Sequence, residues 1–418
     1  MDSLIAQPLT LESGLVLPNR LVKASMAENL ADKDLLPTEP AYDAYKAWAD
    51  GGWGLVLTGN VQVDARFLGQ AHDITNNDTI ERTRILDSWK KWATIAKKNG
   101  TPTIVQISHP GRQSPAGAGT RRFFARSVAP SAVPLRLGRG VIPGILSRLL
   151  FGTPREMTSL EIKDVIQRFV DTAVLVAEAG FDGIELHSAH GYLLAQFLAE
   201  ATNKRTDEYG GSAAARAKII VEVIEAIRAA VPASFSVGIK FNSVDRQSPS
   251  ALKDCIEQLQ LIVNAGIDFL EVSGGTYEDP QLHRGPENMT QNTKSDRSEA
   301  REAFFLDFAK AIRGEFPELP LLVTGGFRSR EVMASALSSN SLDLIGIARP
   351  AVLNPLLPKN TILNPEIKDQ NARAYARSIE PSWFFKLIGN VVIGAGVETA
   401  WYGSMIAKIS AWQDIKQI

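Results

Sequence analysis

Apolar residues recur at helical spacing after residue 158 and then give way to a short apolar run. The segment TSLE at 158–161 places a Thr and a Glu at the spacing of a capping box. One helical face then collects Ile162, Val165, Ile166, Phe169, Val170, Ala173 and Val174. Gly180 predicts the end of this helix, and the apolar run 182–187 that follows is typical of a strand.

This helix–glycine–strand order recurs along the chain. AGFDGIELHS at 179–188 is echoed by AGIDFLEVSG at 265–274, which predicts stacked βα units and a parallel sheet. We count eight strand candidates: 21–26, 54–59, 103–108, 182–187, 235–241, 268–274, 320–326 and 343–348. Eight strands close a barrel, so we expect an α/β fold of the (β/α)8 TIM-barrel class. A doubly wound open sheet is the alternative, but no glycine-rich turn follows the first strand.

Two segments fall outside this pattern. Residues 111–155 are polar and rich in Pro and Gly, and they predict an excursion or lid after the third strand. We expect a barrel domain over 1–365 and a C-terminal helical extension over 366–418, packed on the barrel or on a partner. One helical face of the extension carries Val397, Trp401, Met405, Ile409 and Trp412. Within it, VVIGAGVETA (391–400) resembles a nucleotide-binding strand and turn, but too little chain follows to complete a mononucleotide domain.

Composition narrows the functional classes. The chain has 45 basic and 46 acidic residues and no long basic run, which argues against nucleic acid as a partner. The single cysteine, Cys255, excludes an intrachain disulfide, an iron–sulfur centre and a Cys-based zinc site. The first residues carry an acid and no basic region, so we expect no signal peptide. A membrane span is not expected either, and the prediction is a soluble cytoplasmic protein whose oligomeric state stays open.

Candidate chemistry follows the strands, where barrels place their active sites. His187, His190 and Tyr192 lie within six residues at the end of the fourth strand. Two imidazoles can donate hydrogen bonds to one carbonyl-type oxygen, and a tyrosine with a reference pKa of about 10 can supply a proton. Zinc binding by the two histidines is the weaker alternative, because no carboxylate stands at ligand spacing beside them. We therefore expect no metal.

Other strand ends suggest a cofactor. Gln106 can pair with a donor and an acceptor on a heterocycle edge, and Lys240 can stabilise negative charge there, which suits a flavin ring. The loops after the last two strands of a barrel often hold a phosphate, and here they contain Gly325, Gly326 and Arg349.

Together these motifs resemble the old yellow enzyme family of FMN-dependent ene-reductases, over roughly 9–357. The most specific part is HSAHGYLLAQFLAEATNKRTDEYGGS (187–212), supported by LPNRLVKASM, QISHPGRQ, SVAPSAVP, PREMT and VTGGF. The resemblance implies FMN that is reduced by NADH or NADPH and reoxidised by an enone-type substrate. It implies that His187 and His190 bind the substrate oxygen, that Tyr192 protonates Cα, and that Asn29 lies in the substrate pocket. It also implies FMN contacts from Ser25, Met26, Ala27, Asn60, Gln106, Lys240, Gly325, Gly326, Ala348 and Arg349.

Three positions depart from the family pattern. Ala27 replaces a usual Thr or Cys beside the flavin, Asn29 replaces a Tyr found in many relatives, and Lys240 replaces the commoner Arg. Lysine keeps the charge but not a two-pronged hydrogen bond. Three other functions remain open at this point: a redox-neutral flavin-dependent isomerase or cyclase, a metal-dependent barrel hydrolase, and a silent ligand-binding barrel. The physiological substrate is not determined by these motifs.

Overall fold

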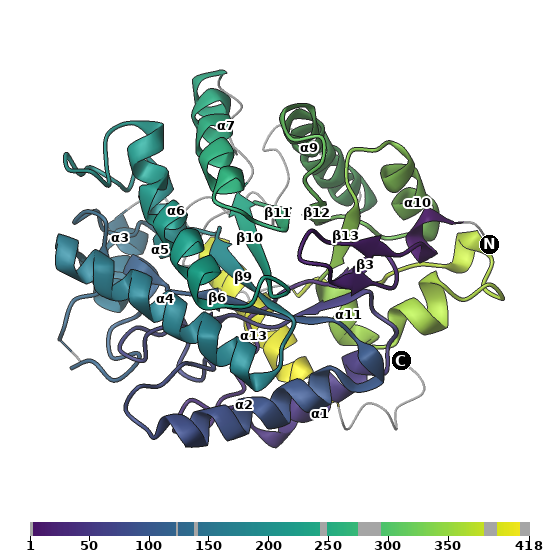
Figure 1. Ribbon diagram of the computed structural model, residues 1–418, viewed down its shortest axis with the longest axis horizontal. Coiled ribbons are helices and arrows are strands. Elements are labelled where there is room, and N and C mark those ends of the chain that lie inside the picture. The colour runs from purple at the N-terminus through teal and green to yellow at the C-terminus, as the bar shows by residue number, and fades with distance from the viewer. Residues whose placement is uncertain are drawn as a thin grey trace.

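The computed structural model describes residues 3–122, 124–137, 141–242, 249–274, 294–379 and 391–409. Eight parallel strands form a closed barrel (Figure 1), in which β4 pairs with β6 to complete the ring. In chain order they are β3 (Leu21–Lys23), β4 (Leu55–Leu57), β6 (Thr103–Ser108), β9 (Gly183–Ser188), β10 (Ser236–Asn242), β11 (Phe269–Ser273), β12 (Leu321–Thr324) and β13 (Leu344–Ile347). Each lies within, or one residue beyond, one of the eight predicted strands, and the (β/α)8 barrel is confirmed.

A helix follows each barrel strand, and every helix but the last returns the chain to the next strand. In order these helices are α1 (Glu39–Ala49), α2 (Arg82–Ala96), α4 (Ser159–Ala179), α6 (Ala213–Ala230), α7 (Pro249–Asn264), α9 (Lys294–Glu315), α10 (Arg330–Ser338) and α11 (Arg349–Leu353). Further elements are β1 (Leu9–Thr10), β2 (Val16–Leu17), β5 (Val61–Gln62), β7 (Val128–Ala129), α3 (Val141–Phe151), β8 (Arg155–Glu156), α5 (Leu193–Leu198) and α13 (Val391–Ile406). Of the helices in the described ranges, none combines the length and apolar character that a membrane span needs.

The capping signals of α4 act as the sequence predicts. Thr158 Oγ1 accepts a hydrogen bond from the Glu161 backbone N–H, and the Glu161 carboxylate accepts one from the Thr158 backbone N–H. These two bonds satisfy donors that the first helical turn leaves free. Gly180 ends the helix with φ of 93°, a left-handed conformation that glycine adopts without strain.

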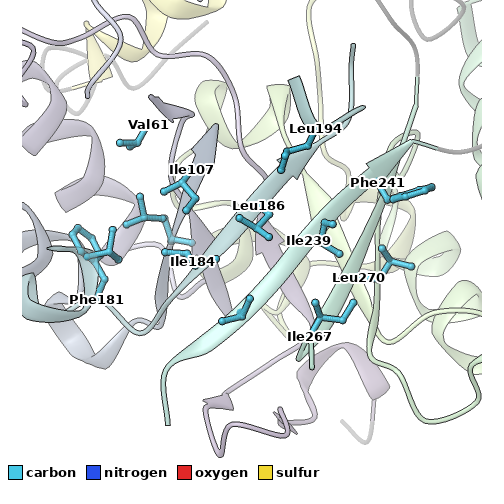
Figure 2. Packing of buried hydrophobic residues seen from close by; sticks show 14 of the residues in the cluster. Val61, Ile107, Phe181, Ile184, Leu186, Leu194, Ile239, Phe241, Ile267 and Leu270 are labelled. Atoms are coloured by element: carbon cyan, nitrogen blue, oxygen red, sulfur yellow. The ribbon is translucent and has the colours of Figure 1, made fainter. Parts of the chain in front are cut away.

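Alternate residues of each strand point into the barrel or out toward the helices. The inner face is apolar at the amino ends of the strands, where the hairpin β1–β2 closes the barrel with Leu11 and Leu17. At Gly238 only glycine fits, because an added Cβ would lie 2.1 Å from the Phe269 ring. The outer face is mainly apolar, and Figure 2 shows part of it, including Ile107, Ile184, Leu186, Ile239, Phe241 and Leu270. Polar residues occupy the inner face at the carboxyl ends of the strands.

The two outlying segments contain structure that the sequence did not specify. The excursion over 111–155 includes the helix α3, and the parallel pair β7–β8 joins the middle of the excursion to its C-terminal end. Residues 391–400 are helical, so the strand and turn of a nucleotide motif are not formed there. The helix α13 lies against α11 and α1, and Tyr402, Ile406 and Ile409 join the main core. Trp412 lies outside the described residues, and a domain boundary at residue 365 remains a prediction.

Candidate active site

The end of β9 and the loop that follows it bring both predicted histidines and the tyrosine together. His187 Nε2 lies 3.3 Å from His190 Nδ1, and the Tyr192 ring stacks on His187 with centroids 4.5 Å apart. His190 adopts a left-handed backbone, with φ of 54°, and Asn242 Oδ1 accepts its backbone N–H at 3.0 Å. His190 Nε2 lies 3.0 Å from Ser273 Oγ. Residues from β10 and β11 therefore fix the orientation of a loop that leaves β9.

The His187 imidazole is neutral. Burial, then the neighbouring His190 and Lys240, lower the pKa of His187 well below its usual value. The Ala189 backbone N–H donates to His187 Nδ1 at 3.3 Å, which assigns the ring proton to Nε2. The Nε2–H group of His187 then points toward His190, so one oxygen placed at this point can contact both rings.

A polar layer lies across the barrel one pleat below the histidines. The register of β10 with β11 places Lys240 opposite Glu271, and the register of β6 with β9 places Gln106 opposite Glu185. Lys240 Nζ donates to Glu271 Oε1 at 2.7 Å, and Gln106 Nε2 donates to Glu185 Oε1 at 2.6 Å. Ser25 Oγ, from the loop after β3, donates to Gln106 Oε1 at 2.8 Å. The predicted Ser25, Gln106 and Lys240 thus all take part in the hydrogen bonds of this polar layer.

A buried ion pair ties together the loops after β3 and β4. Glu28 accepts hydrogen bonds from Lys23 Nζ at 3.2 Å, from the Gly59 backbone N–H at 3.0 Å and from the Tyr45 hydroxyl. Met26 and Ala27 are half-buried in the first of these loops. Next to Gly59, the side-chain Nδ2 of Asn60 is buried without a hydrogen-bond partner among the described residues.

The loops after β12 and β13 hold the remaining predicted residues. Gly325 and Gly326 have φ of 149° and 84°, so both positions favour glycine. An added Cβ on Gly325 would also lie 2.9 Å from the Phe305 ring. Ala348 precedes α11, and Arg349 Nη1 pairs with Glu398 Oε1 of α13 at 2.9 Å. The C-terminal helix therefore reaches the residue that the sequence predicts to bind phosphate.

The donors around this mouth fit the polar edge of a flavin. A buried amide N–H at Asn60 lacks an acceptor among the described residues, and Lys240 and Gln106 can each donate a further hydrogen bond besides the one to its glutamate. Two glycines and an arginine at the far side suit a phosphate. In the described part of the chain, no group of three His, Cys, Asp or Glu residues is arranged to hold a metal ion.

Some polar residues named by the motifs lie elsewhere. Asn29 is exposed, with φ of 57°, and its Oδ1 accepts the His72 backbone N–H at 3.0 Å. His109 is buried behind the site, 4.0 Å from Asp64, and burial lowers its pKa to about 4. Arg112 Nη1 donates to the backbone carbonyl of Pro134 at 3.1 Å and so anchors the excursion.

Sequence reasoning missed the carboxylates of the polar layer. Glu185 and Glu271 each stand alone in an otherwise apolar strand, in GIELHS and FLEVS. An acid at an inward position of a barrel strand is rare unless it is paired, and this was the available signal. Glu28 gave no comparable signal, because it lies outside any regular element.

Comparison with known proteins places the whole barrel in one family. The profile of the NADH:flavin oxidoreductase / NADH oxidase family matches residues 5–364. The chain is 50% identical over 403 residues to the NADH-dependent flavin oxidoreductase iliE of Neonectria sp., covering 95% of this chain but only 53% of that relative. It is 47% identical over 382 residues to the NADH-dependent flavin oxidoreductase iliE of Hypocrea jecorina, covering 91% of this chain and 94% of the relative.

A solved structure shows the same fold. Morphinone reductase in complex with tetrahydroNAD superposes with a TM-score of 0.68 and 22% identity, over 87% of this chain and 92% of the other. The chain belongs to the NADH:flavin oxidoreductase / NADH oxidase family, the old yellow enzyme family of FMN-dependent oxidoreductases that take hydride from NADH or NADPH.

Proposed function

We propose that this protein reduces the C=C bond of α,β-unsaturated carbonyl compounds, with His187, His190 and Tyr192 as its catalytic residues. The observation that carries the proposal is the neutral His187 ring, 3.3 Å from His190 and stacked on Tyr192. With the His187 proton on Nε2, His190 Nδ1 is the acceptor in the 3.3 Å contact between the rings, and the His190 proton lies on Nε2, facing Ser273 Oγ. A substrate carbonyl oxygen would take the place of this contact and accept from His187 Nε2–H, and a change of the His190 tautomer would turn a second N–H toward the same oxygen.

These residues stabilise charge and deliver a proton. Negative charge that builds on the substrate oxygen is held by the two imidazole N–H groups, and loss of one such donor typically costs about 3 kcal/mol in the transition state. Tyr192 holds a proton on its hydroxyl and donates it to the substrate Cα. Bound FMN would supply the hydride chemistry. Its ring would be held by Ser25, Met26, Ala27, Asn60, Gln106 and Lys240, and its phosphate by Gly325, Gly326, Ala348 and Arg349.

We further propose NADH as the hydride donor, because the two relatives described above are named NADH-dependent. Asn29 remains our proposed substrate contact at the exposed rim, where a Tyr stands in many relatives. Steady-state rates with NADH and NADPH at equal concentration test the first point, and a higher kcat/KM with NADPH would contradict it.

The test of the reaction is Tyr192→Phe, with the two half-reactions measured separately by stopped flow. Reduction of the bound flavin by NADH should be nearly unchanged, because that step needs no proton from Tyr192. Reoxidation by a cyclic enone should slow by about a hundredfold, the lower range for a positioned acid. Reoxidation by oxygen is the internal control and should be spared. Equal slowing of both half-reactions would contradict the role of Tyr192, and enone turnover without NADH would select a redox-neutral reaction instead.

A further inference from the structure

The polar layer below the histidines brings two buried carboxyl groups together inside the barrel. Lys240 donates to Glu271 Oε1, and Gln106 donates to Glu185 Oε1. The second oxygens, Glu271 Oε2 and Glu185 Oε2, are buried without another hydrogen-bond partner among the described residues, and the two carboxyl groups are close enough to interact with each other. Gln106 in turn accepts from Ser25. Lys240 and Ser25 lie at the two ends of this polar layer, and we propose that both contact FMN.

The polar layer contains two carboxyl groups but only one cation that is directly bonded to either of them among the described ion pairs. Glu185 and Glu271 are both 0% exposed, and Lys240 is the cation that contacts them among the described ion pairs. Lys240 is also close enough to interact with Lys23 from β3 and with His187 from β9. A second buried negative charge would have no cation of its own, and burial of an unpaired charge is costly. Two carboxyl groups in contact under such conditions retain one proton between them.

The two carboxyl groups differ in their surroundings. Burial, and next the charge of Glu271, raise the pKa of Glu185 well above its usual value. Burial opposes ionisation of Glu271 as well, but Lys240 and the neighbouring Glu185 carboxyl outweigh it and hold the pKa of Glu271 below its usual value. The retained proton therefore belongs to Glu185.

We propose that Glu185 and Glu271 are positioning residues of the cofactor site that share a single proton. Glu271 is the carboxylate that holds Lys240, and Glu185 is a neutral carboxyl that donates to Glu271. Glu185 also accepts from Gln106 Nε2 while Ser25 donates to Gln106 Oε1, so the orientation of the Gln106 amide is fixed. The function of this pair rests on the proposed contacts of Lys240 and Gln106 with FMN.

The first test is infrared spectroscopy of the protein as purified with its flavin. At pH 8 Asp73, whose pKa burial raises to about 6, is ionised, so its carboxyl does not contribute a protonated band. We expect the carbonyl stretch of a buried, protonated carboxyl in the wild type, and we expect Glu185→Gln to remove it. Persistence of that band in Glu185→Gln, or its absence from the wild type, would overturn the assignment of the proton.

The second test compares the two glutamine variants. In Glu185→Gln the amide reproduces a neutral carboxyl, with a donor to Glu271 and an acceptor for Gln106. In Glu271→Gln the carboxylate that holds Lys240 is lost. We expect Glu271→Gln to shift the two-electron midpoint potential of bound FMN by at least about 30 mV, a tenfold change in equilibrium constant, and Glu185→Gln to shift it far less. Equal shifts in the two variants would contradict unequal roles.

Lys240→Met separates this inference from the proposed function. A clear change in FMN affinity and midpoint potential in Lys240→Met, with none in Glu271→Gln, would retain Lys240 at the cofactor and refute Glu271 as its positioning residue. No change in either variant would instead refute the placement of Lys240 beside FMN. The infrared band reports the shared proton independently of both results.

Discussion

Replacement of Lys23 by Met tests the buried ion pair that underlies the cofactor loops. Lys23 Nζ lies 3.2 Å from Glu28 Oε1 and 4.1 Å from the centroid of the Trp48 ring, and it donates to the Leu57 carbonyl at 3.0 Å. The Lys23 and Glu28 side chains are 0% and 4% exposed. Because Glu28 also accepts the Gly59 N–H, the pair joins the loops that follow β3 and β4.

The magnitude follows from what each variant leaves behind. Lys23→Met keeps the Glu28 carboxylate buried with only the Gly59 N–H and the Tyr45 hydroxyl as donors. Removal of one partner from a buried ion pair costs about 3–5 kcal/mol of unfolding free energy. Glu28→Gln should cost a similar amount, since it leaves the ammonium buried. The double variant removes both charges, so its cost should fall below the sum of the single costs by about 3 kcal/mol.

The assay is urea unfolding of all three variants, with FMN affinity measured in parallel by flavin fluorescence. Lys91→Met is the matched control: Lys91 also lies over an aromatic ring of α1, 4.1 Å from the Tyr42 centroid, and pairs with Glu39 at 2.6 Å, but this pair is exposed. We expect its urea midpoint to equal that of the wild type. Additive single costs, or a Lys23→Met midpoint as high as that of Lys91→Met, would refute the reasoning.

Three further outcomes are expected. His109 is neutral in the folded protein, where burial lowers its pKa to about 4, and it titrates near its reference pKa of about 6.5 when unfolded. It therefore contributes about 3 kcal/mol to the free energy of unfolding above that reference pKa, and this contribution is lost as the pH falls toward 4. His109→Gln should flatten the dependence of the unfolding free energy on pH in this range, and an unchanged dependence would contradict the prediction. Gly69→Ala would place a methyl 3.0 Å from the Tyr192 hydroxyl and should slow enone reoxidation by up to about a hundredfold while sparing reduction by NADH; unaffected reoxidation in stopped flow would disprove this contact. Glu398→Gln should tighten FMN binding about fivefold, because it removes the negative charge that pairs with Arg349 beside the proposed phosphate site. Weaker binding in a fluorescence titration would contradict this expectation and show that Glu398 positions Arg349.

The amino-acid sequence determined the features that depend on local pattern. The periodicity of α4, its capping residues and its terminal glycine act over a few neighbouring positions, and each is found as predicted. The eight strands could be counted because each is a short apolar run between turn signals. His187, His190 and Tyr192 could be grouped because residues within six positions of one another must lie close together in any fold.

Tertiary structure decided which distant residues meet. The Lys240–Glu271 and Gln106–Glu185 contacts depend on the registers of β10 with β11 and of β6 with β9, and a shift of one residue would turn these side chains to the opposite face. The partner of Arg349 comes from a helix 49 positions later, whose docking depends on packing against α11 and α1. The sequence revealed solitary acids in apolar strands, but only the closure of the barrel assigned their partners, because pairing across strands is a property of register and not of local composition.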